Sequence, residues 1–257
     1  MRNFFDFTGK VVLVTGASSG IGRATAEFFG SCGASVAITY LNNKGGADAA
    51  VAAIANGNGD RSPIAIKADV TKHSEIEAMI REVEDGFGPV DILVNNAGSL
   101  VERLKTLEMT EERWNEVINL NATSAFFAAK AVIPKMLEKG TGVIVNVTSI
   151  AGRNGGALGS IHYSSAKAAI LTMTKGLAKE FATQGIRVNA VSPGVIDTPY
   201  HETFTTPEIM ANLRKAIPMG REGRPDEVAS VIAFLASDAA SYLCGETIEV
   251  NGGLLMD

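Results

Sequence analysis

Short runs of β-branched and other apolar residues alternate with longer helical stretches along this chain, and this alternation limits its fold more than any other feature. Seven runs predict strands, at 11–15, 35–40, 63–68, 90–95, 142–148, 186–191 and 247–250. The stretches that predict helices lie at 21–31, 46–55, 74–85, 110–138, 161–183 and 226–236. Strands that alternate with helices in this way predict a parallel sheet covered by helices on both faces.

Local signals agree with this pattern. The run at 142–148 is apolar almost throughout, as expected where both faces of a parallel strand are covered. Gly33 follows the first predicted helix, where a left-handed cap is common, and Pro225 and Asp226 open the last one. With 257 residues, 46% of them hydrophobic, the chain can bury one large core. We expect one α/β domain over residues 1–257, a Rossmann-type, doubly wound, seven-stranded parallel sheet.

The segment 198–220 fits the alternation poorly. It mixes aromatic, polar and aliphatic side chains, namely Tyr200, His201, Phe204, Met210 and Leu213. We interpret it as a helical excursion over one edge of the sheet that serves as a substrate lid. The alternative is a packed surface insertion without function.

Charge and residue usage exclude several kinds of site. The net charge is −5 without long runs of one sign, so we expect no nucleic-acid partner. The only cysteines, Cys32 and Cys244, are expected to be free thiols in a reducing compartment. The three histidines, His73, His162 and His201, are scattered, and no spacing of ligand residues resembles a metal site. We therefore expect no metal.

The N-terminal segment and the hydropathy of the chain bear on targeting. Asp6 stands where a signal peptide would need an uninterrupted apolar stretch, and no run of about 18 apolar residues occurs. We expect a soluble, cytoplasmic protein without a membrane partner.

A glycine-rich turn follows the first predicted strand and leads into a helix. In an open parallel sheet, ligands bind beyond the carboxyl ends of the strands. Glycines allow the backbone to approach a pyrophosphate closely, and a helix N-terminus offers free N–H groups and a positive dipole end. The spacing differs from G-x-G-x-x-G, so the turn alone also fits a tight connection. The candidate cofactor-binding residues here are Gly16, Ser18, Ser19, Gly20, Ile21 and Gly22.

Two further predicted strands end in residues that suit the same ligand. Asp69 ends the third strand, where it could accept a hydrogen bond from an adenine amino group, and Val70 follows it. The fourth strand runs into Asn95, Ala97 and Gly98, and these small residues would leave room beside a cofactor. Each of these signals alone also fits ordinary loop chemistry.

The fifth predicted strand ends at Ser149, and the helix after it contains Tyr163 and Lys167. Residues four apart lie on one helical face, one turn from each other. A free phenol titrates at a pKa near 10, and a neighbouring ammonium is expected to lower that pKa and to make tyrosine a usable general acid or base. Ser149 could hydrogen-bond the substrate oxygen and hold it against the phenol. In isolation the pair also fits a half-buried aromatic beside a solvated lysine, and Ser149 a helix cap or turn residue.

Taken together, these motifs resemble those of the short-chain dehydrogenase/reductase family, over the whole chain, and are most similar to its 3-oxoacyl-carrier-protein reductase branch. The resemblance rests on the glycine turn, on 95–98, Asn121, Ser149, Tyr163 with Lys167, Pro193-Gly194, and on 245–253. It implies an enzyme that moves a hydride between a nicotinamide dinucleotide and a carbonyl or secondary alcohol. It also implies that Asn121 holds a water through which Lys167 relays protons, that Lys167 binds the nicotinamide ribose, and that Thr198 contacts the carboxamide. Further cofactor contacts are expected at Pro193, Gly194, Val195 and Ile196.

The residues after the second predicted strand bear on the choice of cofactor. An acid at this strand end would hydrogen-bond the ribose hydroxyls and repel a 2′-phosphate. Here the chain has Tyr40, followed by Leu41 and Asn42, with a lysine two residues further on. We hypothesise that NADP(H) is preferred and that NAD(H) is possible, although Ser18 and Ser19 replace the basic residue frequent in the family's glycine turn.

The sequence constrains the substrate less than it constrains the cofactor. In the carrier-protein branch, docking of the acidic carrier uses basic residues at two places where this chain has Gly140 and Gln184. The leading hypothesis is a ketone or 3-oxoacyl reductase, and a sugar or polyol dehydrogenase of the same family is the alternative. A rival from another class is a non-catalytic dinucleotide-binding sensor or interaction protein. The resemblance further implies a homotetramer.

Overall fold

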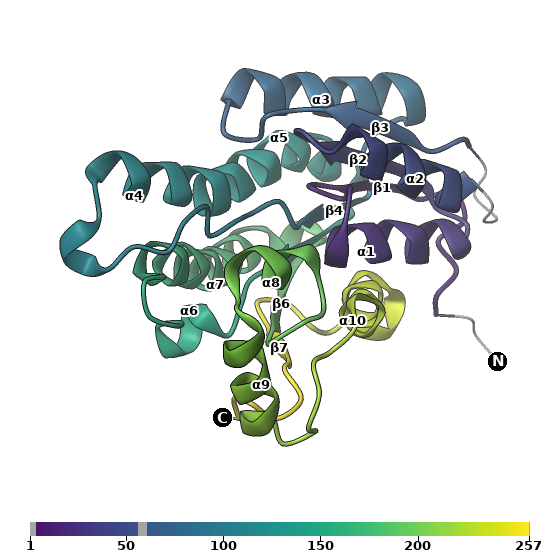
Figure 1. Ribbon diagram of the computed structural model, residues 1–257. Helices are drawn as coiled ribbons and strands as arrows, with labels where there is room; N and C mark the ends of the chain where they lie inside the picture. The colour runs from purple at the N-terminus through teal and green to yellow at the C-terminus, as the bar shows by residue number, and fades with distance from the viewer. Residues whose placement is uncertain (1–3, 56–60, 257) are drawn as a thin grey trace.

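Seven parallel strands form one sheet in the order β3-β2-β1-β4-β5-β6-β7 (Figure 1). The computed structural model describes residues 4–55 and 61–256. The strands are β1 (Val11–Val14), β2 (Ser35–Tyr40), β3 (Ile64–Lys67), β4 (Ile92–Asn95), β5 (Gly142–Val147), β6 (Ile186–Pro193) and β7 (Thr247–Val250). The strand order reverses between β1 and β4, and this arrangement places a ligand crevice beyond their carboxyl ends. The predicted doubly wound α/β fold is confirmed.

Helices cover both faces of the sheet. One face packs against α1 (Gly20–Ser31), α2 (Lys44–Ala55) and α10 (Pro225–Ala236), and the other against α3 (His73–Phe87), α5 (Ser124–Lys139) and α7 (Ile161–Phe181). Because side chains alternate along a strand, Val12 and Val14 lie in the first core while Val11 and Leu13 lie in the second. This two-sided burial explains why the central strands are apolar almost throughout.

Helix ends occur where the local signals predict them. Gly33, just after α1, has φ +90°, and a Cβ on it would lie 2.6 Å from Thr8 Oγ1. Pro225 is in the first turn of α10, and Asp226 and Glu227 follow it at the positive end of the helix dipole.

The predicted helix at 110–138 is instead three consecutive pieces. Between α4 (Glu111–Ile118) and α5 lies η2 (Asn119–Thr123), a single π-helical turn. Polar side chains bond backbone carbonyls here: Asn121 Nδ2 donates to Val117 O at 2.9 Å and Ser124 Oγ donates to Leu120 O at 2.6 Å. Apolar spacing does not report one inserted residue, so the sequence pattern missed this turn.

One helical stretch, Glu111–Lys139, is long and apolar enough by length and composition to cross a membrane. In this protein it is a core element: Ala128, Val132 and Met136 of α5 are buried against the sheet. We regard it as a core helix.

The excursion at 198–220 consists of two helices, α8 (Pro199–Phe204) and α9 (Pro207–Ala216), beside the C-terminal segment (Figure 1). Its two ends meet. Asp197 N donates to Gly223 O at 2.9 Å, and Gly223 N donates to Val195 O at 3.0 Å. The excursion therefore leaves the sheet and returns to it at one point.

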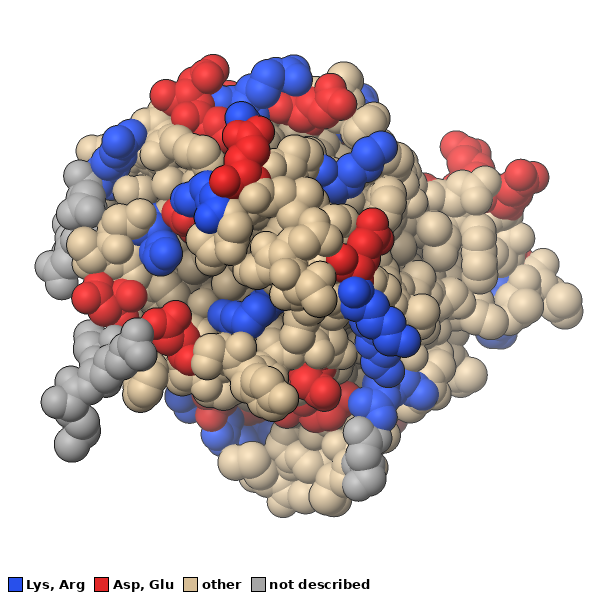
Figure 2. All heavy atoms as spheres, turned by 180° about the vertical axis from the view of Figure 1, so that it is seen from behind, with Lys and Arg blue, Asp and Glu red and all other residues tan. Residues whose placement is uncertain are grey.

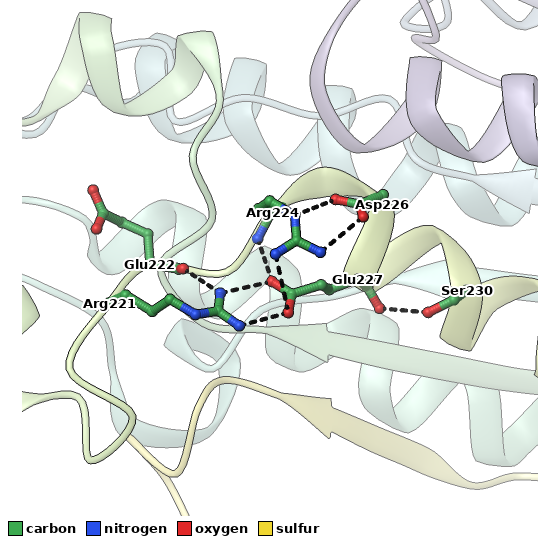
Figure 3. A network of polar contacts seen from close by, with 6 residues as sticks. All are labelled: Arg221, Glu222, Arg224, Asp226, Glu227 and Ser230. Carbon is green, nitrogen blue, oxygen red and sulfur yellow. Dashed lines mark hydrogen bonds and ion pairs between the residues drawn. The ribbon is translucent and has the colours of Figure 1, made fainter.

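An ion-pair network fixes the returning end of the excursion (Figure 3). Arg221 binds both carboxylate oxygens of Glu227, at 2.7 and 2.8 Å, and Glu227 also accepts the Arg224 backbone N–H at 2.7 Å. The Glu222 side chain points away from Arg221 in Figure 3 and pairs with Arg214 of α9, Nε to Oε2 at 2.6 Å. The network joins this returning segment to α9 and to the start of α10.

Short additional turns complete the chain. They are η1 (Thr106–Glu108), α6 (Ala151–Asn154), η3 (Ala182–Gln184) and η4 (Asp238–Ala240). Acidic and basic side chains are interspersed over most of the face seen in Figure 2. Cys32 and Cys244 are free. Among residues 4–55 and 61–256, no three His, Cys, Asp or Glu side chains come together as metal ligands would.

Candidate active site

A cleft of about 510 Å³ opens beyond the carboxyl ends of the strands, between the glycine turn, α7 and the α8–α9 excursion. The structure brings most of the predicted site residues together there. Those that line the cleft are Gly16, Ser19, Gly20, Ile21, Gly22, Gly98, Ser149, Tyr163, Lys167, Pro193, Gly194, Val195, Ile196 and Thr198.

The glycine turn is packed so closely that side chains would not fit in it. Gly16 has φ +63°, and a Cβ on it would lie 2.8 Å from the Ala97 Cα. A Cβ on Gly20, which has φ +55°, would lie 3.2 Å from Thr198 Cγ2. The N-cap of α1, Ser19, makes no side-chain capping bond, and the first turn holds no acid. Free N–H groups at the positive end of a helix, beside a bare backbone, fit the diphosphate of a dinucleotide.

Asn96 ties the glycine turn to the end of β4. Its Nδ2 donates to Thr15 O at 2.9 Å and to Gly16 O at 3.0 Å. Thr15 Oγ1 accepts in turn from the N–H groups of Asn96 and Ala97, each at 3.0 Å. Asn96 is not among the residues predicted for the site, although an amide directly after a strand end is a signal for it.

Asn95 lies on the other side of the chain from Asn96 and away from the cleft. Its side chain is buried, and Nδ2 donates to Ala125 O at 3.1 Å and to Asn146 Oδ1 at 2.9 Å. Asn146 donates onward to Thr174 Oγ1 at 2.9 Å. This side chain, through Asn146, therefore joins β4, β5, α5 and α7.

The other predicted cofactor residues are not part of the cleft lining: Ser18, Tyr40, Leu41, Asn42, Asp69, Val70 and Ala97. Asp69 Oδ1 accepts from Thr71 N at 3.0 Å and from Thr71 Oγ1 at 2.7 Å. Burial raises the pKa of Asp69, but the hydrogen bonds from Thr71 and the charge of Lys72 outweigh it, so the net pKa is lowered. The carboxylate is ionised and shapes the turn before α3.

Tyr163 and Ser149 form the polar centre of the cleft. Tyr163 lies in the first turn of α7, and its side chain and that of Ser149 both line the cleft. Ser149 Oγ also accepts the Ala151 N–H at 3.1 Å, which fixes the serine at the end of β5. Lys167, one turn further along α7, is buried, with Nζ 5.6 Å from the Tyr163 ring centroid and donating to Val147 O at 2.9 Å.

The expected lowering of the tyrosine pKa is wrong for this structure. Burial, with a smaller contribution from Tyr200, raises the pKa of Tyr163, and the Ser149 side chain only partly opposes this. Burial also lowers the pKa of Lys167 to about 8, because the ammonium is as shielded from water as the phenol is. Tyr163 is therefore fully protonated at neutral pH, which suits a proton donor to a carbonyl oxygen.

Asn121 faces Lys167 across Gly98. Asn121 Nδ2 donates to Ser99 O at 2.8 Å and to Val117 O at 2.9 Å, while Oδ1 is buried without a hydrogen-bond partner in the described part of the chain. A Cβ on Gly98 would lie 2.4 Å from Asn121 Oδ1 and 3.2 Å from Lys167 Nζ. The π-helical turn thus aims a free acceptor at the gap beside the buried ammonium.

Several cleft residues were missed as site residues. The excursion contributes Tyr200, whose ring centroid lies 6.0 Å from that of Tyr163, and His201. Both belong to the segment predicted as a lid, so their presence in the cleft is consistent with that interpretation. Arg103, from the loop after β4, also lines the cleft, and its sequence neighbourhood gave no signal.

Comparison with known proteins extends over almost the full chain. A family model described as enoyl-(acyl carrier protein) reductase matches residues 16–255. A 3-oxoacyl-[acyl-carrier-protein] reductase of Synechocystis sp. is 43% identical over 250 residues, which are 97% of this chain and 98% of the relative. Relatives with the same description from Vibrio cholerae and Escherichia coli are 42% and 40% identical over 251 residues, 98% of this chain and 99% of each relative.

Proposed function

Because this chain belongs to the short-chain dehydrogenase/reductase family and is an NAD(P)-dependent oxidoreductase of CH–OH and carbonyl groups, we propose that it reduces a ketone with Tyr163 as proton donor. The relatives named as 3-oxoacyl reductases favour a 3-oxo compound as substrate. The observation that supports the role of Tyr163 most strongly is its position with Ser149 and buried Lys167 inside the cleft that begins at the glycine turn, with Lys167 Nζ 5.6 Å from its ring centroid.

The described residues suit a bound dinucleotide, which supplies or accepts the hydride. We propose that the backbone of Gly16–Gly22 and the N-terminus of α1 bind its diphosphate. Asp69 would meet the adenine, Lys167 the nicotinamide ribose, and Thr198, packed against Gly20, the carboxamide. The remaining predicted cofactor residues would complete this surface.

Proton transfer would be carried out by this chain's own groups. Ser149 and Tyr163 would both hydrogen-bond the substrate oxygen, and the high pKa of Tyr163 keeps its proton available for that oxygen as the hydride arrives at carbon. Lys167 would restore the proton, and the unpartnered Asn121 Oδ1 would hold a water that links the ammonium to solvent.

Replacement of Tyr163 by phenylalanine tests the role of the phenol. The variant keeps the ring but removes the proton, so we expect normal cofactor binding and a loss of turnover of at least about a hundredfold. Cofactor affinity is measured by fluorescence titration and turnover by nicotinamide absorbance on a neutral 3-oxo ester. Unchanged turnover in this variant would contradict the role of Tyr163. If the unmodified enzyme binds the cofactor but turns over none of a broad panel of ketones and polyols, that result would favour a non-catalytic binding protein.

For the cofactor, we propose NADP(H) over NAD(H), because β2 ends in Tyr40 with no acid at the ribose position. Lys44, the nearest cation after it, is paired with Asp48 at 2.7 Å and would have to leave that partner to meet a 2′-phosphate. A clear preference for NADH in kcat/KM would refute the proposal.

We also propose a cytoplasmic homotetramer, with α4, α5, α7 and β7 at its interfaces. Exposed apolar side chains on this part of the surface, Phe126 and Ile161, support the proposal. Light scattering after gel filtration measures the assembly, and a monomer would contradict it.

A further inference from the structure

The charged side chains that line the cleft are all positive. Among the described residues that line it, Arg103 and Lys167 carry positive charge, and none is an aspartate or glutamate. Lys167 is assigned to the chemistry. Arg103 has no role in the proposed reaction, so its place in the cleft requires an explanation.

Arg103 differs from most of the described arginines in having no acidic partner. Arg113, Arg153 and Arg221 are each within 4.0 Å of a glutamate, but Arg103 has no such neighbour among residues 4–55 and 61–256. Its guanidinium bonds only backbone carbonyls: Nε donates to Phe204 O at 3.0 Å and Nη1 to Leu158 O at 3.2 Å. These two bonds fix the side chain and leave donors of the guanidinium for a ligand, since an arginine has five N–H groups.

The loop that presents Arg103 is held in a strained shape. Val101, two residues earlier, has φ +65°, a left-handed conformation that is costly for a β-branched residue. The strain is held by local bonds: Val101 N donates to Ser99 Oγ at 3.0 Å, and Glu102 O is bonded to the buried His162 Nε2 at 3.0 Å. Strain of this kind persists where the surroundings require one conformation, and here it sets the position of Arg103.

A chain of contacts links Arg103 to the surroundings of the proton donor. It bonds the carbonyl of Phe204, and the Phe204 ring is 4.9 Å from that of Tyr200, which is 6.0 Å from Tyr163. The charge of Arg103 also acts to lower the pKa of Tyr200, against the larger effect of burial. Arg103 and Tyr163 line one cleft of about 510 Å³, which would also have to hold the nicotinamide end of the dinucleotide, so a substrate that contacts both residues has to be small.

We propose that Arg103 binds the carboxylate of a short oxo acid whose ketone faces Ser149 and Tyr163. The assignment deepens the proposed function and rests on it. Arg103 offers a guanidinium fork that matches a carboxylate, and apolar residues of the lining would cover the carbon chain, namely Ile150, Ile209, Leu213 and Leu254. The carboxylate takes no part in bond making. The ketone carbon gains the hydride, its oxygen gains the Tyr163 proton, and the reduced dinucleotide is oxidised.

The test compares anionic and neutral substrates of the same carbon skeleton. The probes are 2-oxobutanoate and 3-oxobutanoate, each with its ethyl ester, and the enzymes are the unmodified protein, Arg103→Gln and Arg103→Lys. Arg81→Gln is the matched control, because Arg81 is an exposed residue of α3 that pairs with Glu77.

For at least one acid we expect kcat/KM of the unmodified enzyme to exceed that of its ester. Arg103→Gln should raise KM for that acid by about ten- to a hundredfold, as expected for a lost charge-assisted pair, with the ester changed less than about threefold. Arg103→Lys should fall between the two, and Arg81→Gln should match the unmodified enzyme.

Two results would overturn the inference. One is an ester turned over as well as or better than its acid in both pairs. The other is an equal loss of kcat/KM for acid and ester in Arg103→Gln, as expected if Arg103 only holds the excursion in place through its bond to Phe204 O. In both cases turnover of the ester leaves the proposed reductase intact, whereas cofactor binding without turnover of any probe or panel compound would overturn both proposals.

Discussion

Asn121 Oδ1 and Lys167 Nζ flank the space that a side chain on Gly98 would fill, 2.4 and 3.2 Å from that Cβ position. A buried acceptor without a partner and a buried ammonium thus share one small gap. Glycine at position 98 keeps this gap open, which is a requirement of the proposed proton supply to Tyr163.

Gly98→Ala is therefore expected to reduce kcat. The new methyl group would force Asn121 or Lys167 to move, and a displacement of about 1 Å at a catalytic group can cost about a hundredfold in rate. Gly86→Ala in α3 is the control, because a Cβ there meets nothing within 4 Å. Single-turnover kinetics with a neutral ketone measure the effect, and a Gly98→Ala enzyme as fast as the control would show that the gap is not needed.

The pH dependence of the reaction should follow Lys167. Its pKa is lowered to about 8 by burial, so the ammonium loses its proton as pH rises through that value, while the raised pKa keeps Tyr163 protonated. We expect kcat/KM for ketone reduction to be constant near neutral pH and to fall above about pH 8. A profile that stays flat to pH 10 would contradict this.

Glu227 should contribute to stability in a pH-dependent way. The Arg221 hydrogen bonds and the Arg224 N–H lower its pKa to about 2 from an ordinary value of 4.5. A lowered acid pKa stabilises the fold above the ordinary value and loses this effect as pH falls from 4.5 toward 2. Glu227→Gln should thus lose about 1 kcal/mol or less at pH 7, with a difference from the unmodified protein that shrinks in acid.

Thermal unfolding at a series of pH values measures the contribution of Glu227. Glu77→Gln, which removes an exposed carboxylate on α3, serves as the control and should show a smaller difference at pH 7. A Glu227→Gln difference that grows in acid would have the wrong sign for this account.

Cofactor choice should respond to Tyr40. Tyr40→Asp places a carboxylate at the end of β2, where it would hydrogen-bond ribose hydroxyls and repel a 2′-phosphate. We expect the ratio of kcat/KM for NADPH to that for NADH to fall at least about tenfold, in line with a lost or reversed charge contact. Tyr40→Asn, which is neutral, is the matched control, and an unchanged ratio in the aspartate variant would exclude this position as the determinant.

The fold was predictable because its signals are local. Apolar runs of strand length, the glycine turn and the four-residue spacing of Tyr163 and Lys167 are properties of neighbouring residues, and the structure places them as predicted. The turn around Asn121 was not predictable, since one inserted residue hardly changes the apolar pattern of a long helix.

Three features of the site depend on tertiary contacts that the sequence pattern does not report. The sign of the Tyr163 pKa shift depends on burial, which spacing along a helix does not report. The direction of the Asn95 side chain depends on which face of the sheet α5 and α7 cover. Arg103 belongs to an irregular loop, so only the folded chain shows that it lines the cleft.

The closure of the excursion at Val195, Asp197 and Gly223 has a consequence for how such a scaffold diversifies. A segment whose two ends meet at one point can be exchanged for another of different length without a change in strand register. Replacement of 199–222 would alter which molecules reach Tyr163 and would leave the glycine turn and its neighbour Thr198 unchanged. In this architecture the range of substrates can therefore change independently of dinucleotide recognition.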